Sequence, residues 1–243
     1  IEYNTDFNTR FTVEGFYKRY DRYPFLLRDS ISLANLGGDF GVIGNEPVNS
    51  TSEGRTYGLE LMAQQKLYKG FFGIVSYTFV RSEFTDGSGE FKPSAWDSRH
   101  IVTSTLGKKI KGNWEIGARW RFYGGSPYTP YDVMRSSAIP VWNVTGRGLP
   151  DYTQLNALRL GNAHNLDVRV DKKWFFEKWS LNLYLDIQNV YNFQAESVPY
   201  LDVVRDDSGN PVLDPDNPGF YLTRTLPNVT GTVLPSIGIV VDL

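Results

Sequence analysis

Apolar and polar side chains alternate residue by residue through three segments in the second half of the chain. In each segment, one set of alternate positions is apolar and the other is mostly polar or charged. The apolar sets are Trp114, Ile116, Ala118, Trp120 and Phe122, then Leu166, Val168 and Val170, and then Trp179, Leu181, Leu183, Leu185 and Ile187. Successive side chains of a β-strand point to opposite faces, so this period of two predicts strands with one apolar and one polar face.

The polar positions of these segments are dense in ionisable groups. We interpret the following as facing a water-filled lumen: Glu115, Arg119, Arg121, Asp167, Arg169, Asp171, Lys173 and Asp186. A soluble β-sandwich also alternates, but strands of globular proteins average only about five or six residues. The alternation here runs for about nine to eleven residues, which is enough for a tilted strand to cross a bilayer. In lipid, such strands are viable only in a closed barrel.

The same pattern, followed along the whole chain, predicts an all-β fold with a series of long strands. We place them at about 8–22, 55–67, 71–83, 98–109, 113–124, 164–174, 179–191 and 233–243. Short connections at 67–70, 109–112 and 175–178 alternate with long ones at about 23–54, 84–97, 125–163 and 192–232. Outer-membrane barrels of Gram-negative bacteria have short periplasmic turns and long extracellular loops. We therefore expect the long loops outside the cell and the C-terminal Leu243 in the periplasm.

Composition and candidate chemistry change this picture little. Phe, Trp and Tyr make up 15% of the chain, which suits the aromatic girdles of a membrane barrel, and the net charge of −2 does not indicate a nucleic-acid partner. Cysteine is absent and the two histidines lie far apart in sequence, so we predict no metal site and no cofactor. We also predict no enzymatic activity. Carboxylates such as Asp167 and Asp186 could face one another across adjacent strands, but their basic neighbours indicate a charge ladder.

Five stretches of the sequence carry a resemblance to a known family. They are Ala-Trp-Asp-Ser-Arg-His at 95–100, Gly-Gly-Ser-Pro-Tyr-Thr-Pro at 124–130, Asn-Leu-Asp-Val-Arg-Val-Asp-Lys-Lys at 165–173, Leu-Asp-Ile-Gln-Asn-Val-Tyr-Asn at 185–192 and Pro-Ser-Ile-Gly-Ile-Val-Val-Asp-Leu at 235–243. Together they resemble the C-terminal barrel region of TonB-dependent outer-membrane receptors, especially the Bacteroidetes type. The final Leu243 is a departure, because outer-membrane proteins commonly end in an aromatic residue that the assembly machinery reads.

The resemblance implies a transmembrane, antiparallel, up-and-down β-barrel of about 22 strands, of which residues 1–243 would form roughly the last eight. It also implies that an N-terminal plug, a TonB box and the earlier strands lie outside this chain, and that the TonB complex acts through that part. The alternative is a self-contained eight-stranded barrel. Its narrow interior would have to pair every lumen charge, so we favour the larger barrel.

We expect function to lie in the loops and the lumen. Four aromatic residues among Pro and Gly in the loop 125–163 are candidate stacking surfaces for a sugar or a siderophore: Tyr128, Tyr131, Trp142 and Tyr152. The competing interpretation is that they pack on neighbouring loops or join the outer aromatic girdle. The loop 192–232 is expected either to cover the barrel mouth or to dock a surface lipoprotein lid.

Three hypotheses follow. The first is a receptor, embedded in outer-membrane lipid, that imports a nutrient such as a siderophore, glycan or peptide through a plugged barrel, driven by TonB. The second is a receptor-like barrel that serves as a scaffold subunit of an envelope complex. The third is a small structural barrel formed by this chain alone. A plug and a TonB box would distinguish the first from the second, and chain stoichiometry would settle the third.

Overall fold

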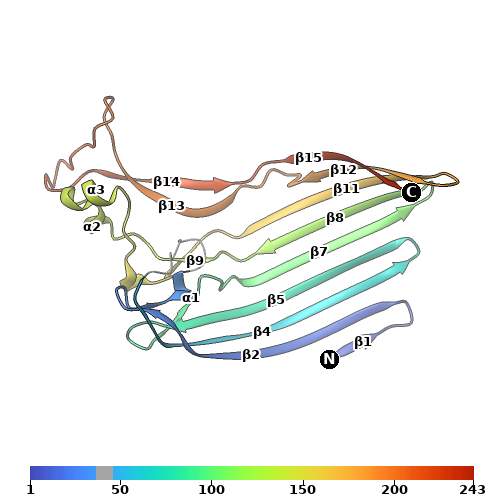
Figure 1. Cartoon of the computed structure of the whole chain (residues 1–243), viewed down its shortest axis with the longest axis horizontal. Coiled ribbons are helices and arrows are strands. Elements are labelled where there is room, and N and C mark those ends of the chain that lie inside the picture. Colours follow the sequence, from blue (N-terminus) through green and yellow to red (C-terminus); the bar gives the residue numbers. More distant parts are fainter. Residues whose placement is uncertain (37–45) are drawn as a thin grey trace.

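The computed structural model describes residues 1–36 and 46–243 and is dominated by one large antiparallel sheet (Figure 1). Strands that follow one another along the chain also lie side by side in it. In spatial order they are β1 (Glu2–Asn4), β2 (Thr9–Leu26), β4 (Val48–Tyr68), β5 (Phe71–Thr85), β7 (Arg99–Ile110), β8 (Trp114–Tyr123), β11 (Ala163–Phe175), β12 (Ser180–Gln188) and β15 (Leu234–Asp242). The short β3 (Ile31–Ser32) pairs with β2, and β6 (Phe91–Pro93) pairs with β5. The predicted all-β, up-and-down fold is confirmed.

Each long strand predicted from the alternation is present, and most boundaries differ by only one or two residues. The largest differences are at the loop ends of β2 and β4, which pair further than the alternation indicated. Register shifts at Tyr20/Tyr23 and Tyr23/Pro24 accommodate the extension, so that Leu26 still pairs with Val48. Such bulges insert extra residues into a strand, which breaks the period of two on which the prediction relied.

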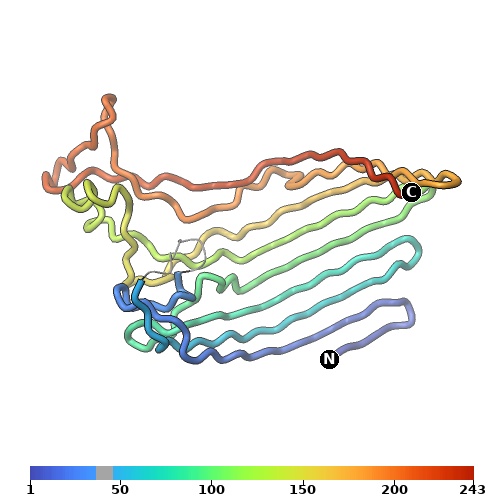
Figure 2. Tube along the Cα trace, viewed as in Figure 1, coloured from blue at the N-terminus to red at the C-terminus, as the bar shows by residue number. Residues whose placement is uncertain are grey.

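The sheet is open, with a free edge on each side. Within the part of the chain that the structure describes, β1 pairs only with β2, and β15 pairs only with β12. The trace in Figure 2 shows these N-terminal and C-terminal strands on opposite sides of the wall. A closed eight-stranded barrel would require hydrogen bonds between the first and last strands. The self-contained barrel is therefore not what this sheet forms, and the chain is one section of a wider wall.

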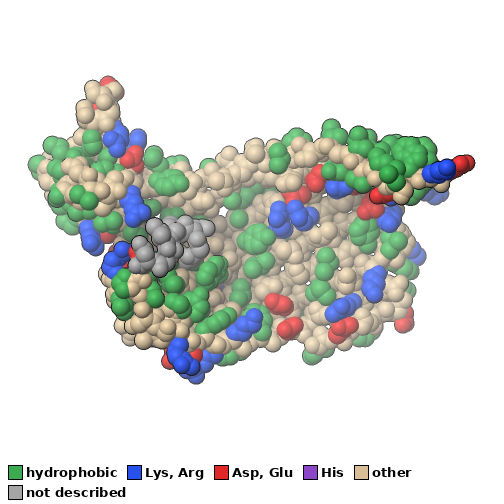
Figure 3. All heavy atoms as spheres, in the orientation of Figure 1, with side chains coloured by type: hydrophobic (Ala, Val, Ile, Leu, Met, Phe, Trp, Pro, Cys, Tyr) green, Lys and Arg blue, Asp and Glu red, His purple; other side chains and the backbone are tan. Residues whose placement is uncertain are grey.

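The two faces of the sheet differ in polarity as the alternation predicts. Val168 lies between Ala118 and Ile187 in register, whereas the next side chain, Arg169, points to the opposite face. The apolar side chains are largely exposed in this chain, to 77% for Ile237 on the edge strand. Figure 3 shows Lys, Arg, Asp and Glu side chains along the middle of the sheet on the visible face. An apolar face this extensive suits contact with lipid.

Short turns lie at one end of the sheet and long connections at the other (Figure 1). The β4–β5 turn has positive φ angles at Lys69 (49°) and Gly70 (83°), and the β7–β8 turn has them at Gly112 (77°) and Asn113 (59°). Glycine and asparagine adopt this left-handed conformation more readily than other residues, so the tight turns are encoded locally. The C-terminus lies at the turn end.

The connection 125–163 has secondary structure of its own, which the sequence did not predict. Its elements are β9 (Pro127–Tyr128), α2 (Val133–Ser137), α3 (Ile139–Thr145), the 3₁₀ helix η1 (Tyr152–Gln154) and β10 (Leu158–Arg159). None of the helices in the described part of the chain is long and apolar enough to cross a bilayer.

The connection 192–232 contains a second unpredicted hairpin, formed by β13 (Ala195–Val203) and β14 (Thr223–Thr230). A register shift between Ser197 and Tyr200 interrupts its alternation. The first long connection, predicted at 23–54, includes α1 (Leu33–Leu36). Its residues 37–45 lie outside the described residues.

Two glycines on neighbouring strands provide a test of how tightly the wall is packed. A Cβ atom at Gly58 would lie 2.1 Å from the carbonyl oxygen of Phe79, whereas at Gly15 the nearest atom would be 4.0 Å away. Gly58→Ala should therefore destabilise the folded barrel of the full-length protein by about 1 to 3 kcal/mol through overpacking. Gly15→Ala should have little effect. Urea unfolding in lipid vesicles would measure both, and equal stability of the two variants would contradict the packing shown here.

Candidate functional site

The polar face is organised around buried or half-buried carboxylates. Asp167 on β11 is almost fully buried and accepts hydrogen bonds from Arg119 (2.8 Å) and Arg121 (3.3 Å) on β8. It also accepts from the side chain of Asn165 at 2.9 Å and from the backbone N–H of Asn189 at 3.0 Å. One carboxylate therefore joins β8, β11 and the end of β12. Two arginines surround it, so this part of the wall has an excess of positive charge.

Two further carboxylates continue this pattern toward the turn end. Arg169 donates to Asp171 at 2.8 Å, and its guanidinium lies 3.7 Å from the ring centroid of Tyr184 on β12. Lys173 on β11 forms an ion pair of 2.9 Å with Asp242 on β15. Each charged group thus has a partner on its own strand or across the wall. We call Arg119, Arg121, Asp167, Arg169, Asp171, Lys173 and Asp242 the charge ladder.

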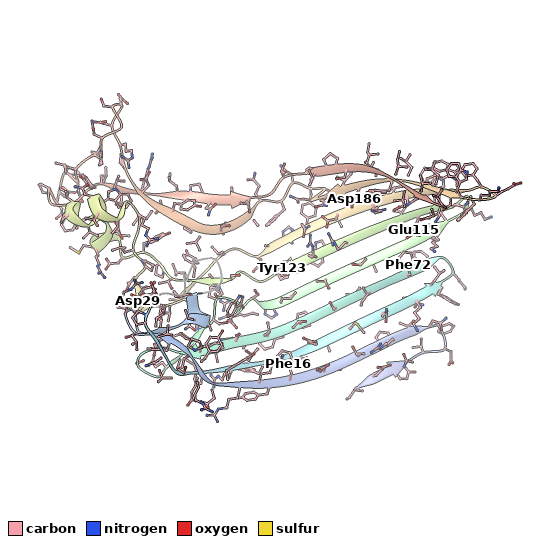
Figure 4. The ribbon with its side chains drawn as sticks, viewed as in Figure 1. Phe16, Asp29, Phe72, Glu115, Tyr123 and Asp186 are labelled. Carbon is pink, nitrogen blue, oxygen red and sulfur yellow. The ribbon has the colours of Figure 1, made fainter. Side chains whose placement is uncertain are left out.

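The two remaining predicted lumen residues are less engaged. Glu115 is 3.9 Å from Lys109, a long ion pair near the turn end. Asp186 lies opposite Arg169 and Ser236 in register, and it has no ion pair among the described residues (Figure 4). Asp186 is therefore not directly opposite Asp167, and the arrangement is a charge ladder without a facing carboxylate pair.

The base of the loops is held by Asp97, which is fully buried at 0% exposure. It accepts hydrogen bonds from the backbone N–H of Ser82 (2.9 Å) and from Nε of Arg81 (3.2 Å), and it pairs with Arg159 from β10. Arg159 also donates to the carbonyl oxygens of Asp97 (2.6 Å) and Gly125 (2.9 Å). This contact fixes the connection 125–163 on β5 and on the segment before β7.

Two asparagines in the left-handed conformation complete the loop base. Asn156 (φ 51°) donates to the carbonyl oxygens of Asn35 at 2.8 Å and Pro93 at 2.7 Å, so it joins three connections. Asn189 (φ 52°) exchanges hydrogen bonds with the backbone of Phe193, each 2.9 Å long. Both side chains act as substitutes for backbone partners where regular pairing stops.

The four candidate stacking residues do not share one environment. Trp142 in α3 is only 5% exposed, and Tyr152 packs against the cluster of Leu26, Ile31 and Leu155. Burial raises the pKa of the Tyr152 hydroxyl. The burial of Trp142 fits packing within the loops, whereas Tyr152 is half-buried beside this cluster.

The other two candidates keep part of their rings accessible. Tyr128 in β9 is half-buried opposite Leu158. Tyr131 is half-buried beside Pro150, and burial raises the pKa of its hydroxyl. Tyr128, Tyr131 and Tyr152 are therefore all half-buried on this connection.

The connections 125–163 and 192–232 join at their outer ends into one unit. The backbone N–H of Tyr221 donates to the carbonyl oxygen of Ser137 at 2.8 Å, and its hydroxyl donates to Asn143 at 3.1 Å. A β-bridge between Ala138 and Phe220 lies beside them. In Figure 1, α2 and α3 accordingly lie next to the outer end of β13 and β14. We call α2, α3, β13 and β14 the loop module.

A family model described as TonB dependent receptor-like, beta-barrel matches residues 1–190 of the chain. The chain belongs to the TonB-dependent receptor β-barrel family. This family consists of outer-membrane transport receptors and not of enzymes, so the predicted family and membrane are confirmed. A search of curated proteins finds no match.

Solved structures of TonB-dependent receptors share the fold of the chain. The ferric-catecholate import receptor Fiu from E. coli K12, in its closed form, matches 98% of the chain with a TM-score of 0.53 and 11% identity. The unliganded ferric citrate transporter FecA matches 99% (TM-score 0.57, 13% identity), as does the ferric yersiniabactin uptake receptor FyuA from Yersinia pestis (0.55, 13%). The chain spans only 26%, 30% and 28% of these three proteins, respectively.

Sequence reasoning missed the residues that hold the loop base of this TonB-dependent receptor barrel. Asp97 and Asn189 lie within stretches that carry the family resemblance, so a signal for them was present. Arg159 and Asn156 lie outside those stretches. Their partners outside the connection 125–163 are Asp97, Pro93 and Asn35, at sequence separations of 62, 63 and 121, so no local pattern could have identified these contacts.

Replacement of Asp167, which has ion pairs, should lower the stability of the barrel more than replacement of Asp186, which has none among the described residues. Asp167→Asn leaves Arg119 and Arg121 without their anion, and we expect a loss of about 1 to 3 kcal/mol, less than for a fully buried pair because both arginines are partly exposed. Asp186→Asn, on the same face without an ion pair, should change stability by less than about 0.5 kcal/mol. Urea unfolding of the full-length receptor would show the difference, and equal effects would contradict the ladder.

The contacts of Asp97 at the base of the loops lead to a second prediction. Asp97→Asn should leave Arg159 without its carboxylate partner, whereas Arg81 keeps its ion pair with the buried Glu83 at 2.7 Å. The connection 125–163 should then detach locally, at a free-energy loss of about 3 kcal/mol. Limited proteolysis of intact cells should then cleave this connection faster. Asp206→Asn in the exposed hairpin tip retains an acceptor for the N–H groups of Ser208 and Asn210 and is the control. Unchanged cleavage in Asp97→Asn would show that other contacts hold the loop.

Proposed function

We propose that the chain is the C-terminal section of the barrel of a receptor that imports a nutrient across the outer membrane with energy supplied through TonB. The observation that carries the proposal is the two-faced open wall, which combines an apolar face with the charge ladder in a member of this family. The polar face would line the lumen, and its mixed charges suit passage of a polar, hydrated ligand. The plug and TonB box belong to the part of the receptor outside this chain.

The arrangement of connections supports the orientation expected from the sequence. Tight turns gather at one end of the sheet and the loop module extends from the other. Outer-membrane barrels have long loops outside the cell, so the loop module is extracellular and the C-terminus is periplasmic. The lipoprotein lid would dock on the loop module, where Met134 and Val144 are 73% and 86% exposed.

The ligand is a siderophore, a glycan or a peptide, captured in part by Tyr128 and Tyr131. Ferric siderophores come first in a test, because the similar structures include receptors named for ferric citrate and ferric yersiniabactin. Both tyrosines lie on the connection 125–163, which Arg159 and Asn156 join to Asp97 and Pro93.

The test is uptake by cells whose chromosomal copy of the full-length receptor is deleted and then restored. Labelled ferric siderophore, oligosaccharide and peptide would each be offered with and without functional TonB. TonB-dependent uptake of one class supports import. If no class is taken up while the receptor is recovered in a larger envelope complex, the scaffold hypothesis replaces it.

Variants of the restored receptor would then test the ligand contacts. Tyr128→Ala and Tyr131→Ala should each weaken binding of the imported ligand by roughly three- to tenfold, the range expected for loss of one aromatic contact. Tyr191→Ala is the control, because Tyr191 binds His164 on the apolar face at 2.8 Å. Full affinity in both loop variants would remove these tyrosines from the ligand site.

A further inference from the structure

A groove of about 530 Å³ lies across β2, β4, β5, β7 and β8 near the turn end of the sheet. Most of the residues that line it have side chains on the apolar face. Three of them are small (Ala63, Gly73 and Ala118), and they leave space between the larger Phe11 and Phe71. This volume falls within the range of small-molecule sites, although the groove lies on the face that suits lipid.

Two lysines on the apolar face stand at this end of the sheet, and neither has an ion pair in the described part of the chain. Lys108 lines the groove, with its ammonium 3.9 Å from the ring centroid of Phe71. Lys172 lies two strands away, with its ammonium 5.2 Å from the Trp114 ring and 5.5 Å from the Trp174 ring. It donates a hydrogen bond to the carbonyl oxygen of Gly112 but meets no carboxylate of the described residues. Both are lysines in an aromatic belt, as occurs where a barrel crosses a membrane–water interface.

The next residue along each strand gives the opposite arrangement. Lys109 and Lys173 point to the polar face, and they pair with Glu115 at 3.9 Å and Asp242 at 2.9 Å. The chain therefore neutralises the two lysines on its polar face and leaves Lys108 and Lys172, on its apolar face, without an anion of its own. An external anion can satisfy them.

We infer that the groove binds one glycerophospholipid of the periplasmic leaflet, with an acyl chain along Ala63, Gly73 and Ala118 and its phosphate at Lys108 and Lys172. Lys108 is opposite Ile116 and Lys172 is opposite Trp114. With strands about 4.8 Å apart and a rise of about 3.4 Å per residue, their Cα atoms lie about 12 Å apart, and a headgroup between them meets both ammonium groups when the side chains extend toward it. Apolar lining suits an acyl chain, and lysines without an ion pair at the interface attract an anionic headgroup. The inference rests on the membrane orientation proposed above and does not depend on transport.

Native mass spectrometry of the full-length receptor, delipidated in neutral detergent and titrated with dipalmitoyl phosphatidylglycerol, would test this binding. Each lysine near a headgroup contributes about fivefold to affinity, so Lys108→Gln with Lys172→Gln should weaken retention of the first lipid by about 25-fold. Ala118→Leu, which fills the groove and leaves both charges, should also weaken it. Lys109→Gln with Lys173→Gln is the control, equal in lost charge but on the polar face, and should retain the lipid.

Several outcomes would overturn the inference. The first two are an equal loss of lipid retention in both double variants and undiminished lipid binding in Lys108→Gln with Lys172→Gln. The third is retention of dipalmitoyl phosphatidylcholine equal to that of dipalmitoyl phosphatidylglycerol. The fourth is displacement of the lipid by millimolar inorganic phosphate, which would indicate a small-anion site. Retained mobility of the unheated barrel on gels would verify that each variant is folded. Uptake assays on the same variants keep the two proposals separate, because loss of lipid binding with normal uptake concerns the groove alone.

Discussion

A strand in lipid must satisfy every backbone hydrogen bond through its neighbours, and the rest of this structure depends on that constraint. The strands β4, β5, β7, β8 and β12 are paired on both sides over most of their length, so their side chains are left to meet two different environments. Because the side-chain period is two, the pairing register that aligns Val168 with Ala118 also aligns Asp167 with Arg119. A slip of one residue would move the charged side chains to the apolar face and the apolar side chains to the charged face, so the register is strongly specified.

The charge ladder adds specificity to that register. Its ion pairs are between half-exposed groups for the most part, and such pairs contribute little stability one by one. Asp167 differs because it is buried, and its four hydrogen-bond partners come from two strands and a strand end. Loss of this carboxylate would leave two cations facing each other, whereas loss of Asp186 would leave no unpaired partner. The ladder therefore matters most where several strands share one anion.

The sequence was sufficient for the wall because alternation is local and long strands repeat it many times. It was less informative where that period fails. The bulges near Tyr23 hid the pairing of β2 with β4 at their loop ends, and the shift between Ser197 and Tyr200 hid the β13–β14 hairpin. The residues of the polar face could be assigned to that face from their alternate positions along each strand. The burial of Trp142 could not, because it depends on how a connection folds on itself, and the Asp97–Arg159 contact joins residues 62 positions apart.

The break between β12 and the hairpin beyond it shows how the wall and the loop module are coupled. Regular pairing of β12 with β15 stops at Gln188–Leu234 and resumes in β13–β14 at Ala195–Thr230. Asn189 bridges this gap, since its side chain binds both the N–H and the carbonyl of Phe193 in place of strand partners. Its own N–H donates to Asp167. Asp167 thus binds Arg119 and Arg121 on β8 and also fixes Asn189 at the base of the β13–β14 hairpin. A ligand charge that displaced those arginines from Asp167 would therefore also affect the position of the loop module.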